Sequence, residues 1–211
     1  MKKLLIIGAG GFGREVLEYA KDMKEAGNAE WEIEGFLDDN LNALDGYSYE
    51  HGITGTIKDH KAESKYVYIC AIGDPKTKLT VGRRFLKEGA EFINIIHPTA
   101  HVGRTCVTGT GVVLCPGALL TADVTLGNFV AINLRSTCGH DVTVGDGCTI
   151  SCFCDLMGFS SLGEGAFLGG GTSILPGIKI GDHAVVGAGS VVISDIEAGA
   201  TAYGVPAKAR Y

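Results

Sequence analysis

The fold of this chain is decided by a repeating stretch whose middle, residues 120–150, reads LTADVT LGNFVA INLRST CGHDVT VGDGCT I. Every sixth residue from Ile96 to Val192 is aliphatic, apart from Thr108 and Cys138. The residue that follows is often glycine, and the fifth residue of each hexad, counted from the aliphatic one, is small or β-branched. An α-helix repeats every 3.6 residues and a strand every two, so neither explains the pattern. A fixed period of six predicts a hexapeptide β-helix.

In such a helix each hexad supplies one short strand and one corner, and three hexads close one coil. The aliphatic residue points into a thin prism, while the glycine is expected at the corner because it reaches backbone angles closed to other residues. Strands one coil apart should stack at roughly 4.8 Å. The register does not slip between residues 96 and 192, so no extruded loop is expected. A β-sandwich rich in Gly and Val is the alternative, but an accidental period would drift.

The end of the repeat carries a family signature. Hexad runs that finish in Gly-Val-Pro-Ala-Lys, here residues 204–208, resemble the left-handed β-helix acyltransferases. That resemblance covers the C-terminal half, and it implies a trimer that uses an acyl-CoA. Residues 1–94 have ordinary mixed patterning instead. We therefore expect a Rossmann-like α/β domain at residues 1–94 and an all-β left-handed parallel β-helix with a C-terminal tail at residues 95–211.

The first domain opens with a strand, a glycine turn and a helix. An apolar run at Lys2–Ile7 precedes GAGGFG at Gly8–Gly13, and a helical pattern runs from Arg14 to Lys24. This order supports a phosphate site, because glycines let a ligand approach the backbone and a helix N-terminus offers free N–H groups. The alternative is that the glycines serve only a tight turn and close packing.

A second strand, Trp31–Leu37, ends in Asp38 and Asp39. In dinucleotide folds an acidic residue at this place binds ribose hydroxyls. The remaining elements are expected at Tyr66–Ile72, Thr77–Glu88 and Glu91–Ile95. Because the unit is about half of a full dinucleotide domain, the sequence favours a nucleotide pocket over a redox NAD site.

An α/β unit of this size before a β-helix resembles sialic acid O-acetyltransferases and the bacillosamine-pathway N-acetyltransferases of nucleotide-linked amino sugars. The resemblance implies an acetyl-CoA-dependent N- or O-acetyltransferase of bacterial surface-glycan biosynthesis. It also implies which residues hold the nucleotide-sugar: Gly10, Gly11, Phe12, Asp38, Asp39 and Gly73. The bacillosamine-pathway enzyme has histidine where this chain has Phe12.

His140 is the candidate for the general base that acyl transfer requires. It takes the outward third position of its hexad, and Asp141 follows it and can orient the imidazole. Its neighbours one coil away are the small Ala122 and Gly158, so we expect room for a substrate beside the ring. The alternative is an ordinary surface His-Asp pair, although the resemblance implies that the pair is the base and its partner.

The resemblance supplies the other site residues. Asn133 matches a substrate-binding position, and Thr149, Gly170 and Ala188 match positions that bind coenzyme A in the neighbouring subunit. The similar enzyme has histidine at the position of Thr149. A covalent mechanism through Cys138 is the enzymatic rival, but the register points that thiol inward. A non-catalytic scaffold or sugar-nucleotide sensor is the rival of another class.

The composition of the chain argues against two classes of binding partner. The formal net charge is −6 without a basic run, so nucleic acid and membrane insertion are not expected. The apolar N-terminal run is too short for a signal peptide, and we expect a cytoplasmic protein. Seven cysteines argue against a disulfide framework there. Three of them could suggest a metal cluster, but the register separates Cys152 from the inward Cys148 and Cys154, so no metal is expected.

The predicted trimer also has a surface argument. Several outward positions of the repeat are apolar, and a monomer seldom leaves such a surface bare. Threefold packing would cover them, and closed symmetry would prevent further growth. The outward apolar residues are Ala122, Phe129, Leu134, Cys152 and Phe159.

Overall fold

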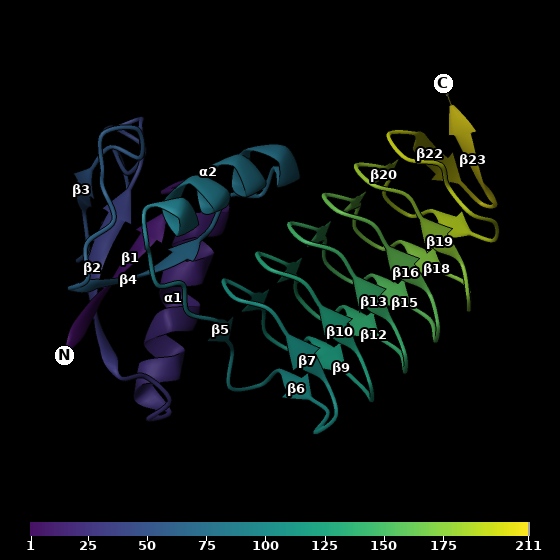
Figure 1. Cartoon of the computed structure of the whole chain (residues 1–211), viewed down its shortest axis with the longest axis horizontal. Helices are drawn as coiled ribbons and strands as arrows, with labels where there is room; N and C mark the ends of the chain where they lie inside the picture. The colour runs from purple at the N-terminus through teal and green to yellow at the C-terminus, as the bar shows by residue number, and fades with distance from the viewer. Residues whose placement is uncertain (211) are drawn as a thin grey trace.

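The molecule is a small α/β domain joined to the end of a long column of short strands (Figure 1). The computed structural model describes residues 1–210. The N-terminus lies in the α/β domain and the C-terminus at the far end of the column (Figure 1). No helix in the described range combines the length and the apolarity needed to cross a bilayer.

The α/β domain is a parallel sheet with a helix on each face. Its strand order is β3-β2-β1-β4. In β1, Leu4 and Ile6 pack with helix α1, whereas Leu5 and Ile7 pack with Phe85 of helix α2. Successive strand residues point to opposite faces, so a sheet covered on both sides needs such a continuous apolar run. The elements are β1 (Lys2–Ile7), α1 (Gly11–Glu25), β2 (Trp31–Leu37), β3 (Ile53–Gly55), β4 (Tyr66–Cys70) and α2 (Pro75–Lys87).

The structure confirms the first three predicted strands, the third of which ends two residues early at Cys70, and both helices of this domain. Helix α2 begins earlier than predicted because Asp74 caps it, with Oδ2 accepting from the Thr77 amide at 2.8 Å. Strand β3 was not expected. The strand predicted at Glu91–Ile95 is wrong: Phe92 forms one bridge to Tyr68, and Ile95 already belongs to the column.

From Ile95 to Val192 the chain is a left-handed parallel β-helix with a two-residue strand in every hexad. Residues one coil apart pair in parallel, as Thr125 does with Thr143. The aliphatic position points inward, and Leu114 and Ile132 are 0% exposed there. The six-residue period, the inward position and the unbroken register are confirmed.

The short strands stack into three faces of eight, six and five strands. The eight-stranded face holds β5 (Ile95–Ile96), β8 (Val113–Leu114), β11 (Ala131–Ile132), β14 (Thr149–Ile150), β17 (Phe167–Leu168), β20 (Val185–Val186), β22 (Thr201–Gly204) and β23 (Ala207–Arg210). The six-stranded face holds β6 (His101–Val102), β9 (Leu119–Leu120), β12 (Thr137–Cys138), β15 (Asp155–Leu156), β18 (Ser173–Ile174) and β21 (Val191–Val192). The five-stranded face holds β7 (Val107–Thr108), β10 (Thr125–Leu126), β13 (Thr143–Val144), β16 (Ser161–Leu162) and β19 (Lys179–Ile180).

Three corners join these faces, and we name each by the faces it connects. The 8/6 corner contains residues 133–135 and the corresponding residues of other coils. In the same way, residues 139–141 mark the 6/5 corner and residues 145–147 mark the 5/8 corner. The antiparallel pair β22–β23 closes the far end of the eight-stranded face.

The glycines of the repeat have a different role from the one predicted. Those directly after the aliphatic position, such as Gly127 and Gly145, do not have a positive φ. A Cβ on Gly145 would lie 2.7 Å from the Glu164 amide of the next coil, so these glycines allow close stacking. The left-handed angles occur two residues later, as at Asp141 with a φ of 61°. The expectation that backbone angles require the first glycine is therefore wrong.

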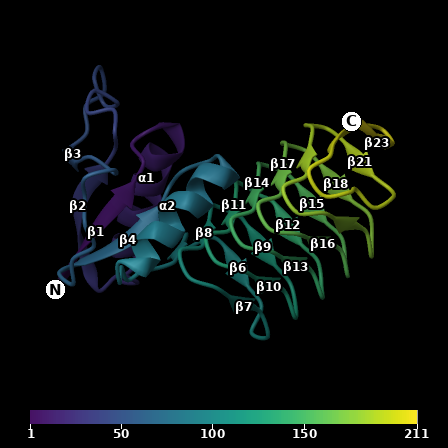
Figure 2. The same cartoon turned by 45° about the horizontal axis from the view of Figure 1, so that its top comes forward.

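The α/β domain packs against the eight-stranded face and the corners beside it (Figure 2). Phe129 of the 5/8 corner is 2% exposed, and it lies against Phe92 and Gly82. Leu134 packs in the cluster under α1. The chain's own domain covers both side chains, which corrects the list of apolar residues proposed for a trimer surface. Phe159 remains 62% exposed.

Candidate functional site

The glycine turn lies at the carboxyl end of β1, where the strand order changes direction. Strand β1 pairs with β2 on one side and with β4 on the other, and the loops after β1 and β4 meet at this edge. A Cβ on Gly8 would lie 3.0 Å from the Ala71 carbonyl oxygen, which shows how close the two loops run. Ligands of open α/β sheets bind at such a switch point.

Two glycines of this edge are not required by the fold. Neither Gly10 nor Gly73 has a positive φ, and a Cβ at either position would have no protein atom within 4 Å. Gly13 is different, because a Cβ there would overlap the Gly8 carbonyl oxygen. Close packing therefore explains Gly13, whereas Gly10 and Gly73 leave open space where a ligand can approach the backbone.

The two predicted aspartates hold the loops around the turn. Oδ2 of Asp38 accepts a hydrogen bond from the Ala9 amide at 2.7 Å, and Oδ1 accepts from the Asn40 amide at 2.8 Å. Oδ1 of Asp39 accepts from the Lys58 amide at 2.9 Å. The structure thus brings Asp38 to the glycine turn, and Asp39 anchors the chain after β3.

Helix α1 presents an uncapped N-terminus here, with Gly11 and the half-buried Phe12 in its first turn. Its N-cap, Gly10, makes no side-chain hydrogen bond, and the first turn holds no acidic residue. Both features favour an anion at the positive end of the helix.

Arg14 also lies at the glycine turn, and it was not predicted as a site residue. Its guanidinium lies 3.8 Å from the centre of the Tyr47 ring, and its Nε is buried without a hydrogen-bond partner among residues 1–210. One terminal nitrogen sits 3.9 Å from the point where Gly11 would carry a Cβ. A cation with unused donors beside a glycine turn suits a phosphate. An arginine inside a helical pattern gave no such signal.

A cavity of about 850 Å³ opens where the two domains meet. Gly73 and Asp74 form its edge on the α/β domain, and Arg83 of α2 lies along its side. Phe167 and Val185 of the eight-stranded face form the opposite wall. The cavity therefore joins the loop after β4 to the later coils of the β-helix.

His140 and Asp141 form a hydrogen-bonded pair on the 6/5 corner. Nδ1 of His140 lies 2.9 Å from Oδ2 of Asp141, and the histidine side chain is 60% exposed. The carboxylate favours the tautomer that keeps its proton on Nδ1, which leaves the lone pair of Nε2 free. The pair can accept a proton from a substrate.

The neighbouring coil holds the imidazole in place. A Cβ on Gly158 would lie 2.6 Å from Nε2 of His140, so the ring occupies the space over that glycine. The Phe159 ring meets the imidazole edge-on, with centroids 5.0 Å apart and planes at 84°. The predicted stacking of Gly158 next to His140 is confirmed. The space over this glycine, which was expected to receive a substrate, is occupied by the histidine ring itself.

The remaining predicted residues lie on another part of the β-helix. Asn133 is on the 8/6 corner, where its Nδ2 donates to the Ile150 carbonyl at 2.8 Å. Gly170 and Ala188 lie higher on the same corner. Gly170 takes the same position in its hexad as Asn128, whose amide donates to the Asp146 side chain one coil further on. The residue one coil beyond Gly170 is Ala188, which has no side-chain acceptor. The Gly170 N–H group is thus available to a ligand.

Thr149 is in a different environment from these corner residues. It lies on β14 under the α/β domain and is 5% exposed. Its hydroxyl donates to the Gly73 carbonyl at 2.9 Å and accepts from Nζ of Lys78 at 2.7 Å. The side chain is therefore occupied inside the chain, and its hydroxyl is not free to contact coenzyme A.

Cys138 is buried in the prism as the register predicted. It is 0% exposed, and burial raises the pKa of its thiol to about 12. A thiol in that state is a poor nucleophile at neutral pH. The inward positions of Cys148 and Cys154 are also confirmed, and all seven cysteines carry free thiols. Within residues 1–210 no three acidic, histidine or cysteine side chains gather as a metal site.

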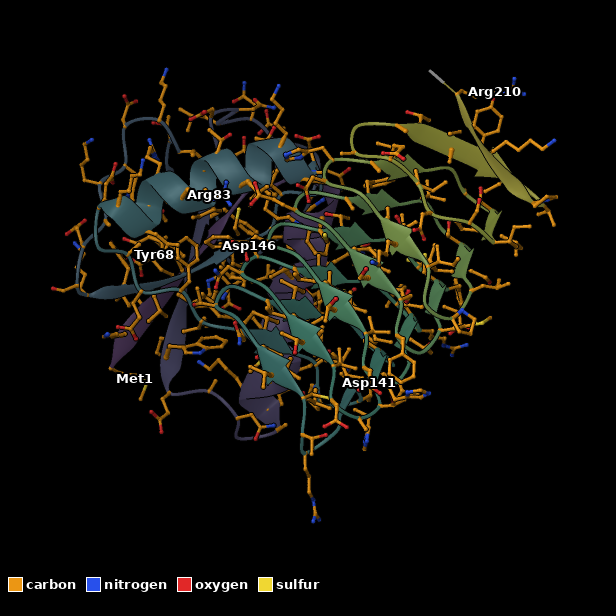
Figure 3. The ribbon with its side chains drawn as sticks, turned by 45° about the vertical axis from the view of Figure 1, so that its right-hand side comes forward. Met1, Tyr68, Arg83, Asp141, Asp146 and Arg210 are labelled. Atoms are coloured by element: carbon orange, nitrogen blue, oxygen red, sulfur yellow. The ribbon has the colours of Figure 1, made fainter. Side chains whose placement is uncertain are left out.

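One chain does not unite all of these residues. The 6/5 corner with His140 is opposite the eight-stranded face, which carries the α/β domain. Figure 3 shows the same separation: Arg83 and Asp146 lie at the domain junction, and Asp141 projects from an edge of the β-helix away from α2. The glycine turn, Asp38 and Gly73 form one group and His140 with Asp141 another.

Both parts of the chain match described families. Residues 3–85 match the PglD N-terminal domain, and residues 159–194 match the six-repeat bacterial transferase hexapeptide family. The chain is 28% identical to a GDP-perosamine N-acetyltransferase of Escherichia coli O157:H7 over 82% of this chain and 78% of that one.

Solved structures agree over the full length. The acetyltransferase domain of PglB from Neisseria gonorrhoeae FA1090 in complex with acetyl coenzyme A has a TM-score of 0.87 and 29% identity, covering 99% of both chains. PerB from Caulobacter crescentus in complex with CoA and GDP-perosamine has a TM-score of 0.85 and 30% identity, covering 100% of this chain and 98% of that one. The chain therefore belongs to the family of hexapeptide-repeat acetyltransferases that carry a PglD-type N-terminal domain.

Proposed function

We propose that this protein is an acetyl-CoA-dependent N-acetyltransferase that acts on a nucleotide-linked amino sugar, with His140 as the general base. The observation that carries the proposal is the His140–Asp141 pair, whose free Nε2 is held over Gly158. PerB from Caulobacter crescentus, whose structure contains CoA and GDP-perosamine, supports the substrate class. We place the reaction in bacterial surface-glycan biosynthesis in the cytoplasm, a reducing compartment that suits seven free thiols.

The chemistry is a direct transfer. The sugar amine attacks the thioester carbonyl carbon, a C–N bond forms, and Nε2 of His140 takes the proton that the nitrogen loses. The C–S bond then breaks, the His140 imidazolium passes that proton to the sulfur, and coenzyme A leaves as the thiol. Asp141 stabilises the imidazolium that forms. No acyl-enzyme is needed, which agrees with the buried state of Cys138.

The acceptor would bind at the switch point of the α/β domain. Its diphosphate would lie against the N-terminus of α1, contacted by the backbone of Gly10, Gly11 and Phe12 and by the Arg14 guanidinium. Asp38 and Asp39 would line the nucleoside end. Gly73, at the edge of the cavity, would direct the amino sugar toward the β-helix.

Coenzyme A would lie along the later coils of the β-helix. Gly170 and Ala188 would contact it through backbone groups, since neither offers a polar side chain. Thr149 would act from the neighbouring face without a direct contact, because its hydroxyl is bonded to Gly73 and Lys78. Asn133 lies on the same corner as Gly170 and would bind the acceptor sugar.

A shared site in a homotrimer would bring the separate groups together. Since His140 lies opposite its own α/β domain, we infer that it serves the acceptor and coenzyme A bound to a neighbouring subunit. Phe159, beside His140 and 62% exposed, would be covered in that interface.

The deciding experiment measures thiol release from acetyl-CoA with a panel of acceptors. The panel contains GDP-perosamine, UDP-linked and dTDP-linked 4-amino sugars, and matched sugars with a hydroxyl in place of the amine. We expect thiol release with at least one amino sugar and none with its hydroxyl counterpart. Binding of a nucleotide-sugar without any thiol release would instead indicate a sensor or scaffold.

A further inference from the structure

Lys78 is buried at the junction of the two domains. It is on the face of α2 that packs on the β-helix, and it is 1% exposed. Its Nζ donates to the Cys148 carbonyl at 3.1 Å and to Oγ1 of Thr149 at 2.7 Å. Both partners are neutral, so no carboxylate hydrogen bond offsets the cost of removing the ammonium from water. Burial lowers the pKa of Lys78 to about 8. Such a costly group suggests a role beyond holding the domains together.

The lysine begins a chain of hydrogen bonds that crosses the junction. A hydroxyl has one hydrogen, so when Thr149 accepts from Lys78 it can still donate to the Gly73 carbonyl at 2.9 Å. The chain therefore runs from α2 through β14 of the β-helix to the loop after β4. It ends at a residue that forms the edge of the cavity.

Other contacts already dock α2 on the β-helix. Leu79 packs on Gly147, where a Cβ would lie 2.4 Å or more from its side-chain carbons. Arg83 makes a two-pronged ion pair with Glu164 at 3.0 and 2.5 Å, and it lies 3.6 Å from Asp146. These contacts hold the helix without Lys78. What the Lys78–Thr149 chain adds is a fixed position for the Gly73 loop.

We propose that Lys78 and Thr149 are positioning residues for the acceptor: they hold the Gly73 loop at a set distance from the β-helix. The inference rests on the proposed function, since it takes Gly73 as part of the acceptor site. It also gives Thr149 a role through its buried hydroxyl in place of a direct contact with coenzyme A. Loss of the chain would loosen the loop and misplace the amino group.

The kinetic test compares two substitutions at Thr149. Thr149→Val removes the hydroxyl and should raise the KM for the acceptor by roughly tenfold, the effect of one or two lost hydrogen bonds, without changing the KM for acetyl-CoA. Thr149→Ser keeps the hydroxyl and should behave like the wild type. Lys78→Met should also raise the KM for the acceptor. The free-energy effect of the double variant on this KM should be smaller than the sum of the two single effects, because both substitutions break the same chain of hydrogen bonds. The acceptor is GDP-perosamine or the panel amino sugar with the highest turnover.

Hydrogen exchange tests the chain independently of activity. The amides of Ile72, Gly73, Asp74 and Lys76 should exchange faster in Thr149→Val than in the wild type or in Thr149→Ser. Thr143→Val is the matched control, because Thr143 is an exposed strand residue on the five-stranded face. Unchanged exchange in Thr149→Val, or an equal rise in both KM values, would overturn the inference. A wild type that acetylates no acceptor would refute the proposed function, while the exchange result would still decide whether the chain holds the loop.

Discussion

At the scale of single residues, the central question is what His140 does. If it is the base, His140→Ala should lower kcat by roughly 10²–10⁴ and leave the binding of both substrates nearly unchanged. Asp141→Asn should cost less, because Asp141 orients the ring and does not take the proton. Steady-state kinetics with binding titrations would measure both effects. A His140→Ala enzyme with near-normal kcat would falsify the mechanism.

Gly158 offers a second test at the same place. A methyl group there would overlap the imidazole, at 2.6 Å from Nε2, and would push the ring from its position. We therefore expect Gly158→Ala to reduce kcat by roughly tenfold or more with little change in either KM, because misplacing a catalytic group by about 1 Å is costly. Gly52→Ala is the matched control, because its added methyl group meets no neighbouring atom and its φ is not positive. Normal kcat in Gly158→Ala would show that the ring has room to move.

The glycine turn predicts opposite results at two neighbouring glycines. Gly10→Ala should fold normally, since its Cβ meets no protein atom, but should weaken acceptor binding by blocking the approach of a phosphate. Gly13→Ala should destabilise the protein, because its Cβ would overlap the Gly8 carbonyl oxygen. Thermal unfolding and acceptor titrations separate the two outcomes. Equal acceptor affinity in Gly10→Ala and the wild type would support the view that the glycines serve packing alone.

At the scale of elements, helix α2 contains a group whose titration should affect stability. The pKa of Lys78 is lowered from 10.5 to about 8 by burial, and the groups that face it are the Cys70 and Cys148 thiols and Asp74. Between these two values the unfolded chain holds more protons than the folded one, so the free energy of unfolding should rise with pH. Below pH 8 both states are protonated and the cost of the buried charge is constant.

Urea unfolding of the wild type and of Lys78→Met at pH 7.5 and 9.5 would check this. The wild type should gain on the order of 2 kcal/mol relative to the variant between these pH values, since one pKa unit corresponds to about 1.4 kcal/mol. Other titrating groups cancel in the comparison. The same difference at both pH values would show that Lys78 keeps an ordinary pKa in the folded protein.

Elements also show which parts of the structure can be read from sequence. The β-helix was predictable because every inward position must be filled by an apolar side chain of similar size. The six-residue period therefore remains visible although Thr108 and Cys138 interrupt the aliphatic series. The burial of Lys78 was not predictable, because a lysine in an amphipathic helix normally points to water. Only tertiary packing brings its side chain to Thr149. Phe129 was assigned to an open surface for a similar reason. Its hexad position gives the direction of the side chain and does not reveal that α2 covers it.

At the scale of the whole molecule, a shared site makes a prediction about mixed assemblies. A chain with His140→Ala lacks the base, and a chain with Ala188→Trp should lack room for coenzyme A. Mixed trimers contain interfaces that unite the intact half of each chain, so some activity should return. Light scattering at low micromolar protein would report the mass, and subunit exchange would be proven with differently tagged chains. An active monomer, or no recovery after proven exchange, would contradict the shared site.

The unbroken hexad register has a geometric consequence of its own. Each hexad turns the chain by about a third of a revolution, and each full coil raises it by roughly 4.8 Å, so direction and height are both counted in residues. Deleting one hexad between His140 and Gly170 would swing everything beyond it onto a neighbouring face. Deleting a whole coil would keep every direction and lower the far end by one step. The number of hexads therefore sets both the direction and the height of every later residue. Only insertions or deletions of whole coils can change the length of the β-helix and keep the later residues on their original faces.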